Sequence, residues 1–169
     1  MEDALILLKS RRSIRKYKDK PVEQDKIEKC LEAARWAPSA SNRQPWEFLI
    51  VKDEKKRKKL SEIHPYAKFI SESPLVFIPL TNPKAHQKYH MSDTALATLQ
   101  YMLEAHSLGL GTCWAGVIGA PFEKDIKEMF GIPEHLNVLG LVATGYPYES
   151  PQKNRKEIDT LVHYEKYSN

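Results

Sequence analysis

Apolar residues at helical spacing predict several helices in this chain. The strongest signal covers residues 91–108, which are rich in Ala, Leu and Met and precede Gly109, a residue suited to the left-handed turn that ends a helix. Another helix begins at Glu23 and ends before Pro38, because proline disfavours helical backbone in the residue that precedes it. Further helices are predicted over residues 3–10 with Asp3 as the N-cap, over 52–63, and over 120–130 with Pro121 in the first turn.

Short apolar runs bounded by turn residues predict buried strands. These runs cover residues 46–51, 75–80, 111–117 and 138–145. Helices and strands follow one another without a Gly/Ser linker, a low-complexity stretch or an internal repeat. This order predicts a single domain spanning residues 1–169, in which helices cover both faces of one sheet. The pattern leaves the strand directions open.

The tail beyond Pro147 is polar and has no core pattern of its own. It nevertheless carries Val162, Tyr164 and Tyr167 at nearly alternate spacing. A solitary strand is not stable in water. The spacing therefore predicts that the tail pairs with another segment, and a second subunit is one such partner.

Composition places the chain among globular proteins. Of its 169 residues 41% are hydrophobic and 28% charged, and a domain of this length buries about 70% of the surface of its unfolded chain. The longest apolar runs, 75–80 and 138–143, fall far short of the roughly 20 residues of a membrane-spanning helix. Charge interrupts the opening MEDALILLKSRR before a secretion signal forms, so we expect a cytoplasmic protein with no membrane partner.

Several common chemistries find no support in the sequence. The chain lacks the motifs G-x-S-x-G, G-x-x-x-x-G-K-S/T, H-E-x-x-H and G-x-G-x-x-G. His86 and His90 have no third ligand nearby, and Cys30 and Cys113 belong to no C-x-x-C pair, so we expect no metal site and two buried reduced thiols. The formal charge of +4 comes partly from residues 52–60, and no aromatic platform accompanies them. We therefore expect no nucleic-acid partner.

Four segments carry candidate chemistry, and the first is the basic segment 11–16. It places four cations and a hydroxyl directly after a helix, a set that suits a phosphate monoester because guanidinium groups donate in a fork that matches phosphate oxygens. Taken alone, a solvated basic turn is the simpler account. The residues concerned are Arg11, Arg12, Ser13, Arg15 and Lys16.

The other three segments are weaker individually. Residues 38–46 hold small and amide-bearing side chains between two prolines, and such side chains approach a planar heterocycle closely. Residues 109–116 put glycines on both sides of a buried strand, which permits close backbone approach by a ligand. Lys153 and Arg155 add two cations in the tail. An ordinary loop, core packing and solvent exposure explain these segments equally well when each is taken alone.

Taken together and in this order, the four segments resemble the nitroreductase family of flavoproteins. The resemblance rests on RRSIRKY, AARWAPSASNRQPW, AHSLGLGTCWAG, and GIPEHLNVLGLVATGYP followed by Lys-x-Arg, and it runs from residue 11 to residue 155. It implies an α+β fold class with a mixed central sheet covered by helices on both faces. It also implies an intertwined homodimer with FMN bound at the subunit interface.

The resemblance assigns expected roles to individual residues. The FMN phosphate would contact Arg11, Ser13, Lys153 and Arg155, with Arg12 along the same stretch. The pyrimidine edge of the flavin would contact Arg15 and Lys68, where positive charge favours reduction because the reduced ring is negatively charged. The backbone of Ala115 and Gly116 would face the flavin and donate a hydrogen bond to N5. The other subunit would line the ring with Pro38, Ser39, Ala40, Ser41 and Asn42, and Gln44 is a further candidate.

The resemblance also implies an activity, that of an NAD(P)H-dependent flavin oxidoreductase. NADH or NADPH would reduce the flavin and leave, and a small-molecule electron acceptor such as a nitroaromatic or a quinone would take its place. No side chain is needed as an acid or a base, so we assign no catalytic residue. The short stretch 81–93 predicts an open acceptor pocket, with Lys84, His86, Tyr89 and His90 as candidate lining residues.

Other functions stay open at this point. One is a different reaction on the same fold, such as flavin reduction, reductive dehalogenation or flavin destruction. Another is a non-catalytic flavin-binding protein that acts as a carrier or sensor. A third is that no flavin binds and the basic residues contact an acidic partner.

Overall fold

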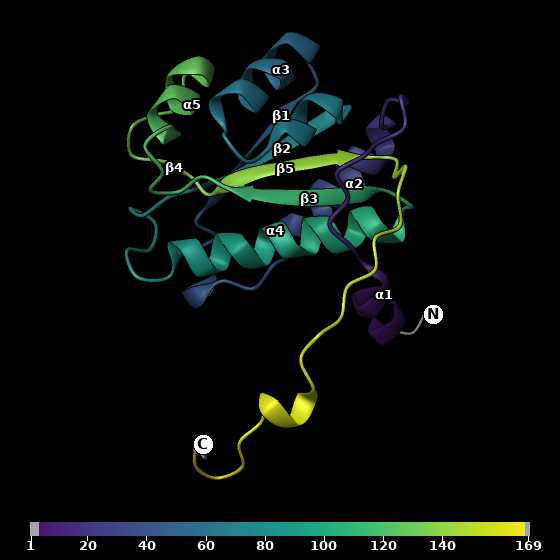
Figure 1. Cartoon of the computed structure of the whole chain (residues 1–169). Coiled ribbons are helices and arrows are strands. Elements are labelled where there is room, and N and C mark those ends of the chain that lie inside the picture. The colour runs from purple at the N-terminus through teal and green to yellow at the C-terminus, as the bar shows by residue number, and fades with distance from the viewer. Residues whose placement is uncertain (1–3, 168–169) are drawn as a thin grey trace.

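The computed structural model describes residues 4–167 and places one sheet at their centre (Figure 1). Its strands are β1 (Trp46–Val51), β2 (Leu75–Thr81), β3 (Gly111–Gly116), β4 (Asn137–Val138) and β5 (Gly140–Gly145). Their order is β1-β2-β5-β3, with β4 beside β2. Every pairing between these strands is antiparallel, and an isolated bridge between Ser13 and Thr112 adds a parallel contact at the β3 edge.

The helices form a layer on each face of the sheet. They are α1 (Ala4–Ser10), α2 (Gln24–Arg35), α3 (Glu54–Ile63), α4 (His90–Ser107) and α5 (Glu123–Phe130), with short 3-10 helices η1 (Ala40–Asn42), η2 (Lys68–Glu72) and η3 (Ile158–Thr160). Helices α2 and α4 pack together on one face, and α3 and α5 cover the other (Figure 1). The expected α+β fold with helices on both faces of a sheet is confirmed.

Strand β2 joins the two layers because all of its residues are buried. Leu75 and Phe77 pack among the residues of α2 and α4, whereas Val76 and Ile78 pack on the α3 and α5 side. The ring of Phe77 stacks on Tyr101 of α4 with a centroid separation of 4.0 Å. Full burial of such a side chain contributes about 1.5–3 kcal/mol to the free energy of unfolding. Because successive side chains of β2 point to opposite faces of the sheet, this one strand stabilises both cores.

Most element ends follow the signals in the sequence. Gly109 has a φ of 77° directly after α4, which confirms the predicted left-handed turn. The predicted cap Asp3 lies outside the described residues. The prediction that Pro121 lies in the first turn of a helix is wrong, because residues 120–122 form a separate turn and α5 begins at Glu123. In that turn the N–H of Glu123 donates to the carbonyl of Ala120 at 3.0 Å.

The strand predicted over residues 138–145 is interrupted at Leu139. The N–H of Leu139 donates to the carbonyl of Pro79 at 3.0 Å. The N–H of Val138 donates instead to the carboxylate of Glu123, at 2.8 Å. Across this point the pairing with β2 shifts by one residue, since Leu80 pairs with Val138 whereas Phe77 pairs with Val142. The extra residue is a β-bulge, and it separates β4 from β5.

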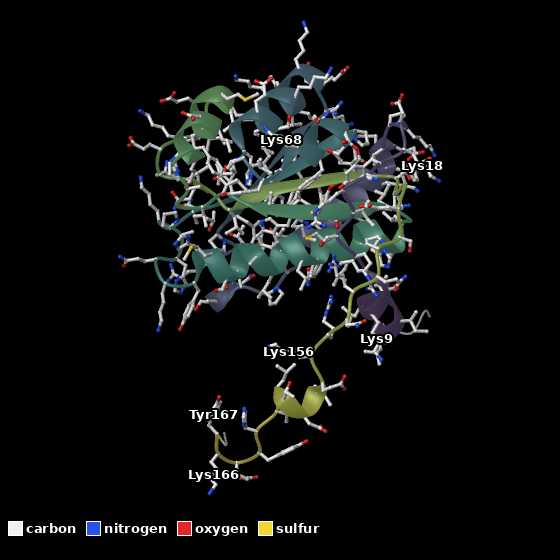
Figure 2. The ribbon with its side chains drawn as sticks, viewed as in Figure 1. Lys9, Lys18, Lys68, Lys156, Lys166 and Tyr167 are labelled. Carbon is white, nitrogen blue, oxygen red and sulfur yellow. The ribbon has the colours of Figure 1, made fainter. Side chains whose placement is uncertain are left out.

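The end of the C-terminal tail, residues 157–167, leaves the body of the molecule as an extended arm (Figure 1). Figure 2 shows Lys166 and Tyr167 at its far end, away from the sheet and its helices. The strand suggested by alternate spacing does not form within the chain, because η3 is the regular element of residues 151–167 and no strand of the same chain lies beside it. The side chains of Tyr164 and Tyr167 are 84% and 79% exposed, so the arm has no apolar partner among the described residues.

Candidate functional site

The basic segment 11–20 is fastened to the β3 edge of the sheet. The N–H of Ile14 donates to the carbonyl of Thr112 at 2.9 Å, and the N–H of Lys18 donates to the carbonyl of Tyr146 at 2.9 Å. Gly111 permits this approach, since a Cβ on that residue would lie 2.6 Å from the side chain of Ile14. The segment is therefore a fixed part of the fold.

Arg11 lies in a cluster of cations from both ends of the chain. Its Nη1 is buried and has no hydrogen-bond partner. Burial lowers the pKa of Arg11, and the neighbouring charges of Arg155 and Arg12 lower it further. A partly buried guanidinium with like charges beside it is costly unless an anion offsets the repulsion and accepts its hydrogen bonds. The arrangement suits a phosphate.

Arg12 has a structural contact that the sequence did not suggest. Its Nη1 donates to the carbonyls of Lys9 and Arg11, at 2.5 and 2.8 Å, and so caps the C-terminal end of α1. Its Nε is buried without a partner, as is the hydroxyl of Thr112. Both residues line a cavity of about 120 Å³ together with Arg11. Thr112 is thus a polar neighbour of the cation cluster; it lies in the candidate segment 109–116, where no sequence motif indicated a role for its hydroxyl.

Ser13 and Arg15 lie further along the same segment. Ser13 forms a side-chain hydrogen bond with Cys113, and the charges of Arg15 and Arg11 also act on that thiol, but burial dominates and raises its pKa. The guanidinium of Arg15 lies over the ring of Phe69, 5.8 Å from its centroid. Phe69 follows Lys68 in η2, and Figure 2 shows Lys68 on that side of the sheet. The structure therefore brings Arg15 and Lys68, the two cations predicted for the pyrimidine edge of the flavin, to one side of the sheet. Lys68 donates to the carbonyl of Ser61 at 3.0 Å.

Ala115 and Gly116 form the end of β3. A buried histidine holds this end, since the Nε2 of His64 lies 2.9 Å from the carbonyl of Gly116. The N–H of Tyr66 donates to Nδ1 of the same ring, so Nδ1 is the acceptor and Nε2 carries the proton that Gly116 accepts. The α-carbon of Gly116 faces open space, since a Cβ at that position would meet nothing within 4 Å. No spacing in the sequence pointed to His64.

The loop of residues 38–45 has an unusual backbone. Ser41, Asn42 and Gln44 have φ values of 52°, 52° and 47°, in the left-handed region that residues with a Cβ disfavour. Such conformations cost about 1–3 kcal/mol each and persist where the surroundings determine them. Their side chains are exposed. The loop therefore exposes polar side chains on a backbone of unusual geometry.

The structure does not bring this loop to the cation cluster. In Figure 1 the dark blue η1 lies by the N-terminal end of α4, whereas segment 11–20 and α1 lie at the opposite end of that helix. Arg11, Arg12, Ser13 and Arg155 gather beside β3, while Pro38, Ser39, Ala40, Ser41 and Asn42 lie elsewhere. Lys153 is exposed on the segment that leads to the arm. Within one chain the two groups therefore lie at opposite ends of α4.

The four residues predicted to line the pocket for the electron acceptor do not all lie at one pocket. His90 is buried, its Nδ1 lies 2.9 Å from the hydroxyl of Thr81, and burial lowers its pKa, so it belongs to the core rather than to a pocket wall. His86 and Tyr89 are in ring contact, 4.9 Å between centroids. Lys84 and His86 line an open surface pocket. Tyr89 does not line this pocket, and a part for Lys84 and His86 in acceptor binding stays a prediction.

Both cysteines are free and buried, as the sequence predicted. Burial raises the pKa of Cys30 to about 12. Residues 4–167 contain no group of three or more His, Cys, Asp or Glu placed to bind a metal ion. Within the same residues, no helix has both the length and the apolar character needed to cross a membrane.

An α+β fold with a clustered set of cations at one sheet edge and a pre-formed loop of small polar residues defines a class of cofactor-binding proteins. The profile of the Nitroreductase family matches residues 8–65 and 61–146. The chain belongs to the nitroreductase family.

Individual relatives agree with this assignment. A Methanothermobacter thermautotrophicus protein provisionally named NADH dehydrogenase/NAD(P)H nitroreductase is 35% identical over 98% of this chain and 88% of its own. The NAD(P)H-dependent FMN reductase of Bacillus subtilis is 27% identical over 100% of this chain and 76% of its own. The structure of an FMN-dependent nitroreductase from Clostridium difficile superimposes with a TM-score of 0.88 at 32% identity, covering 96% of this chain and 99% of that one.

Proposed function

We propose that this protein is an FMN-dependent oxidoreductase that passes hydride from NADH or NADPH through bound FMN to an oxidised small molecule, such as a nitroaromatic or a quinone. The observation that carries the proposal is the buried Nη1 of Arg11, which has no hydrogen-bond partner and lies within a cluster of like charge. The family assignment, the similarity to an FMN reductase and the cation cluster in the same chain all support FMN as the cofactor.

The FMN phosphate would be held by cations from both ends of the chain. Arg11 and Ser13 offer donors from the fixed segment beside β3, and the charge of Arg155 acts on Arg11 from the segment before the arm. Lys153 would add a further cation from that segment. Arg12 stabilises the turn that positions Arg11, because its guanidinium is held by the end of α1. A dianionic phosphate would offset the repulsion among these cations.

The flavin ring would lie between the end of β3 and the loop of a second chain. Arg15 and Lys68 place positive charge where the reduced ring is negative, which favours hydride acceptance. The backbone of Ala115 and Gly116 would donate a hydrogen bond to N5 of the flavin. His64 holds this backbone through its hydrogen bond to the carbonyl of Gly116. Pro38, Ser39, Ala40, Ser41 and Asn42 of the second chain would line the ring. FMN supplies the redox chemistry when bound, and these residues bind, orient and tune it.

We further propose that the protein works as a homodimer of one-domain chains. Leu96 and Leu99 of α4 are 42% and 43% exposed on the face turned away from the sheet, and Leu5, Ile6 and Leu8 of α1 are more than half exposed. The apolar residues of the arm add to this unburied surface. Apolar surface of this extent is typical of an interface. Free buried thiols are typical of the cytoplasm, where we expect the protein to work.

The test is an anaerobic absorbance spectrum of FMN-reconstituted, desalted protein before and after one equivalent of NADH or NADPH. We expect the flavin to be retained and its band near 450 nm, an approximate value for oxidised flavin, to bleach within seconds. Retained flavin that does not bleach would instead indicate a carrier or sensor. Colourless protein would overturn the proposal.

One other reaction has specific support. The similarity to an FMN reductase favours free FMN as an acceptor, and the open pocket near Lys84 and His86 places no narrow limit on acceptor size. The same bleached protein should therefore be mixed with a nitroaromatic, a quinone and free FMN in turn. The acceptor that reoxidises it fastest identifies the reaction.

A further inference from the structure

Two neighbouring residues of α4 hold the two ends of the 38–45 loop. The N–H of Ala40 donates to Oδ2 of Asp93 at 3.0 Å, although the two residues are 53 positions apart in the chain. The hydroxyl of Thr94 donates to the carbonyl of Pro45 at 3.3 Å. Asp93 is 5% exposed and Thr94 is fully buried. The first turn of α4 thus connects the loop to the core at both ends.

The backbone between these contacts needs such support. Ser41, Asn42 and Gln44 all have left-handed φ values, and their side chains are exposed, so burial of their own side chains does not hold them. Within the loop, the N–H of Gln44 donates to Ser39 at 3.0 Å. The hydrogen bond to Asp93 ties this locally bonded turn to a rigid helix. Without the hydrogen bond to Asp93, the local hydrogen bonds would preserve the shape of the turn but would not fix its position relative to α4.

We infer that Asp93 is a positioning residue for the cofactor: it places the 38–45 loop of its own chain where that loop contacts the FMN bound mainly by the partner subunit. The inference rests on the proposed function and adds a residue that touches no cofactor itself. A carboxylate suits the role because a charged acceptor holds an N–H more strongly than a neutral one. Its place in the first turn of α4 also lets the helix dipole stabilise its charge.

The first test compares variants on the same helix. Asp93→Ala should weaken FMN binding at least tenfold, and Asp93→Asn, which keeps an oxygen acceptor, should weaken it less. Thr98→Val is the matched control, because Thr98 is equally buried on α4 but its hydroxyl bonds the carbonyl of Thr94 within the helix. Fluorescence titration gives each FMN Kd, and the melting temperature of the apo-protein reports packing separately. Equal loss of affinity in T98V and D93A would overturn the inference.

The second test asks which subunit Asp93 serves. Chains carrying Arg11→Ala and chains carrying Asp93→Ala are given different tags, and the hybrid dimer is purified. If Asp93 acts across the interface, the hybrid contains one intact site and binds one FMN with wild-type affinity, whereas each mutant homodimer binds weakly. A hybrid in which both sites bind weakly would show that Asp93 acts within its own chain and overturn the inference.

These outcomes separate this inference from the proposed function. A wild-type protein that retains no FMN overturns the proposed function, and the positioning role falls with it. If wild type binds FMN and folded D93A binds it with a Kd within twofold of the wild-type value, the positioning role alone is overturned. If D93A does not fold, D93N and the R11A/D93N hybrid answer the same questions.

Discussion

At the scale of single residues, polar atoms without partners mark the candidate site. The Nη1 of Arg11, the Nε of Arg12 and the hydroxyl of Thr112 are buried without hydrogen bonds, and all three residues line one cavity. Buried polar groups in proteins are nearly always paired. Their concentration at one place therefore indicates a ligand that completes the hydrogen bonds.

Replacing Arg11 tests this conclusion directly. We expect Arg11→Ala to weaken FMN binding at least about tenfold, because a hydrogen bond to a charged group contributes about 1.5–3 kcal/mol. Fluorescence titration measures the change. Lys9→Ala is the control, since Lys9 is an exposed cation on neighbouring α1 (Figure 2). A similar loss in both variants would mean that overall charge, rather than a specific contact, attracts the phosphate.

Two glycines that face each other across β3 and β5 should differ in their tolerance of a methyl group. A Cβ on Gly140 would lie 2.0 Å from Nε1 of Trp114, whereas a Cβ on Gly116 would meet nothing within 4 Å. We expect Gly140→Ala to destabilise the apo-protein by about 1–3 kcal/mol through overpacking. Gly116→Ala should change its unfolding free energy much less. Urea unfolding compares the two, and equal losses would contradict the packing argument.

At the scale of elements, the start of α2 is joined to the exit of β5 by a carboxylate. The hydroxyl of Tyr146 donates to Glu23 at 2.6 Å, and Lys20 pairs with the same carboxylate at 3.1 Å. The hydrogen bond from Tyr146 is the largest cause that lowers the pKa of Glu23 to about 2. The contact therefore depends on pH.

The direction of that dependence follows from the lowered pKa. The ionised Glu23 contributes stability above its ordinary pKa of 4.5, and this contribution is lost as the pH falls toward about 2. We expect wild type to lose more stability than Glu23→Gln between about pH 5 and pH 3. Urea unfolding midpoints at the two pH values measure this. Parallel losses in the two proteins would exclude Glu23 as a contributor, and the exposure of Glu23 makes the expected difference small.

At the scale of the whole molecule, much of the surface that a second chain would cover lies on α1, α4 and the arm. The arm carries Ile158, Leu161 and Tyr164 in exposed positions and extends away from its own body (Figures 1 and 2). An isolated arm of this kind gains no burial energy within one chain. In the proposed homodimer, association with the second chain would remove these apolar residues from water.

Removal of the arm tests its part in assembly. Truncation after Lys156 keeps Lys153 and Arg155 but removes the apolar residues of the arm. We expect the dimer to dissociate at concentrations at least about tenfold higher than wild type, because loss of one well-buried aromatic side chain already exceeds the 1.4 kcal/mol that corresponds to a factor of ten. Sedimentation velocity measures the dissociation. Lys166→Ala, within the same arm, should leave it unchanged.

Removal of the cofactor should also weaken the dimer. A ligand that binds only the native state stabilises it by about 2.7 kcal/mol at a hundredfold excess over its Kd. We therefore expect a higher melting temperature with FMN than without it, and a lower dimer dissociation constant. Equal melting temperatures for the apo-protein and the FMN-saturated protein would count against a site shared between chains.

The periodicity of apolar residues and the glycines and prolines that end helices and strands predicted most of the elements. The helices around residues 24–35 and 90–107, the stop at Gly109 and the central strands all appear where their patterns placed them. Such signals are local, because they express backbone preferences and the alternation of buried and exposed positions within one element. The same locality explains the errors. Interruption of the strand at Leu139 comes from a one-residue shift in its pairing with β2, a contact between distant segments that no local pattern contains.

The sequence by itself determined the nitroreductase-type elements, the helices on both sides of a sheet and the cations available to a phosphate. Tertiary structure decided which of those cations meet: it set Arg11 beside Arg155, committed Arg12 to the end of α1 and buried His90 against Thr81. It also joined Asp93 to Ala40 and His64 to Gly116. The physical reason is that contacts between residues far apart in the chain depend on strand order and packing, which side-chain periodicity does not encode.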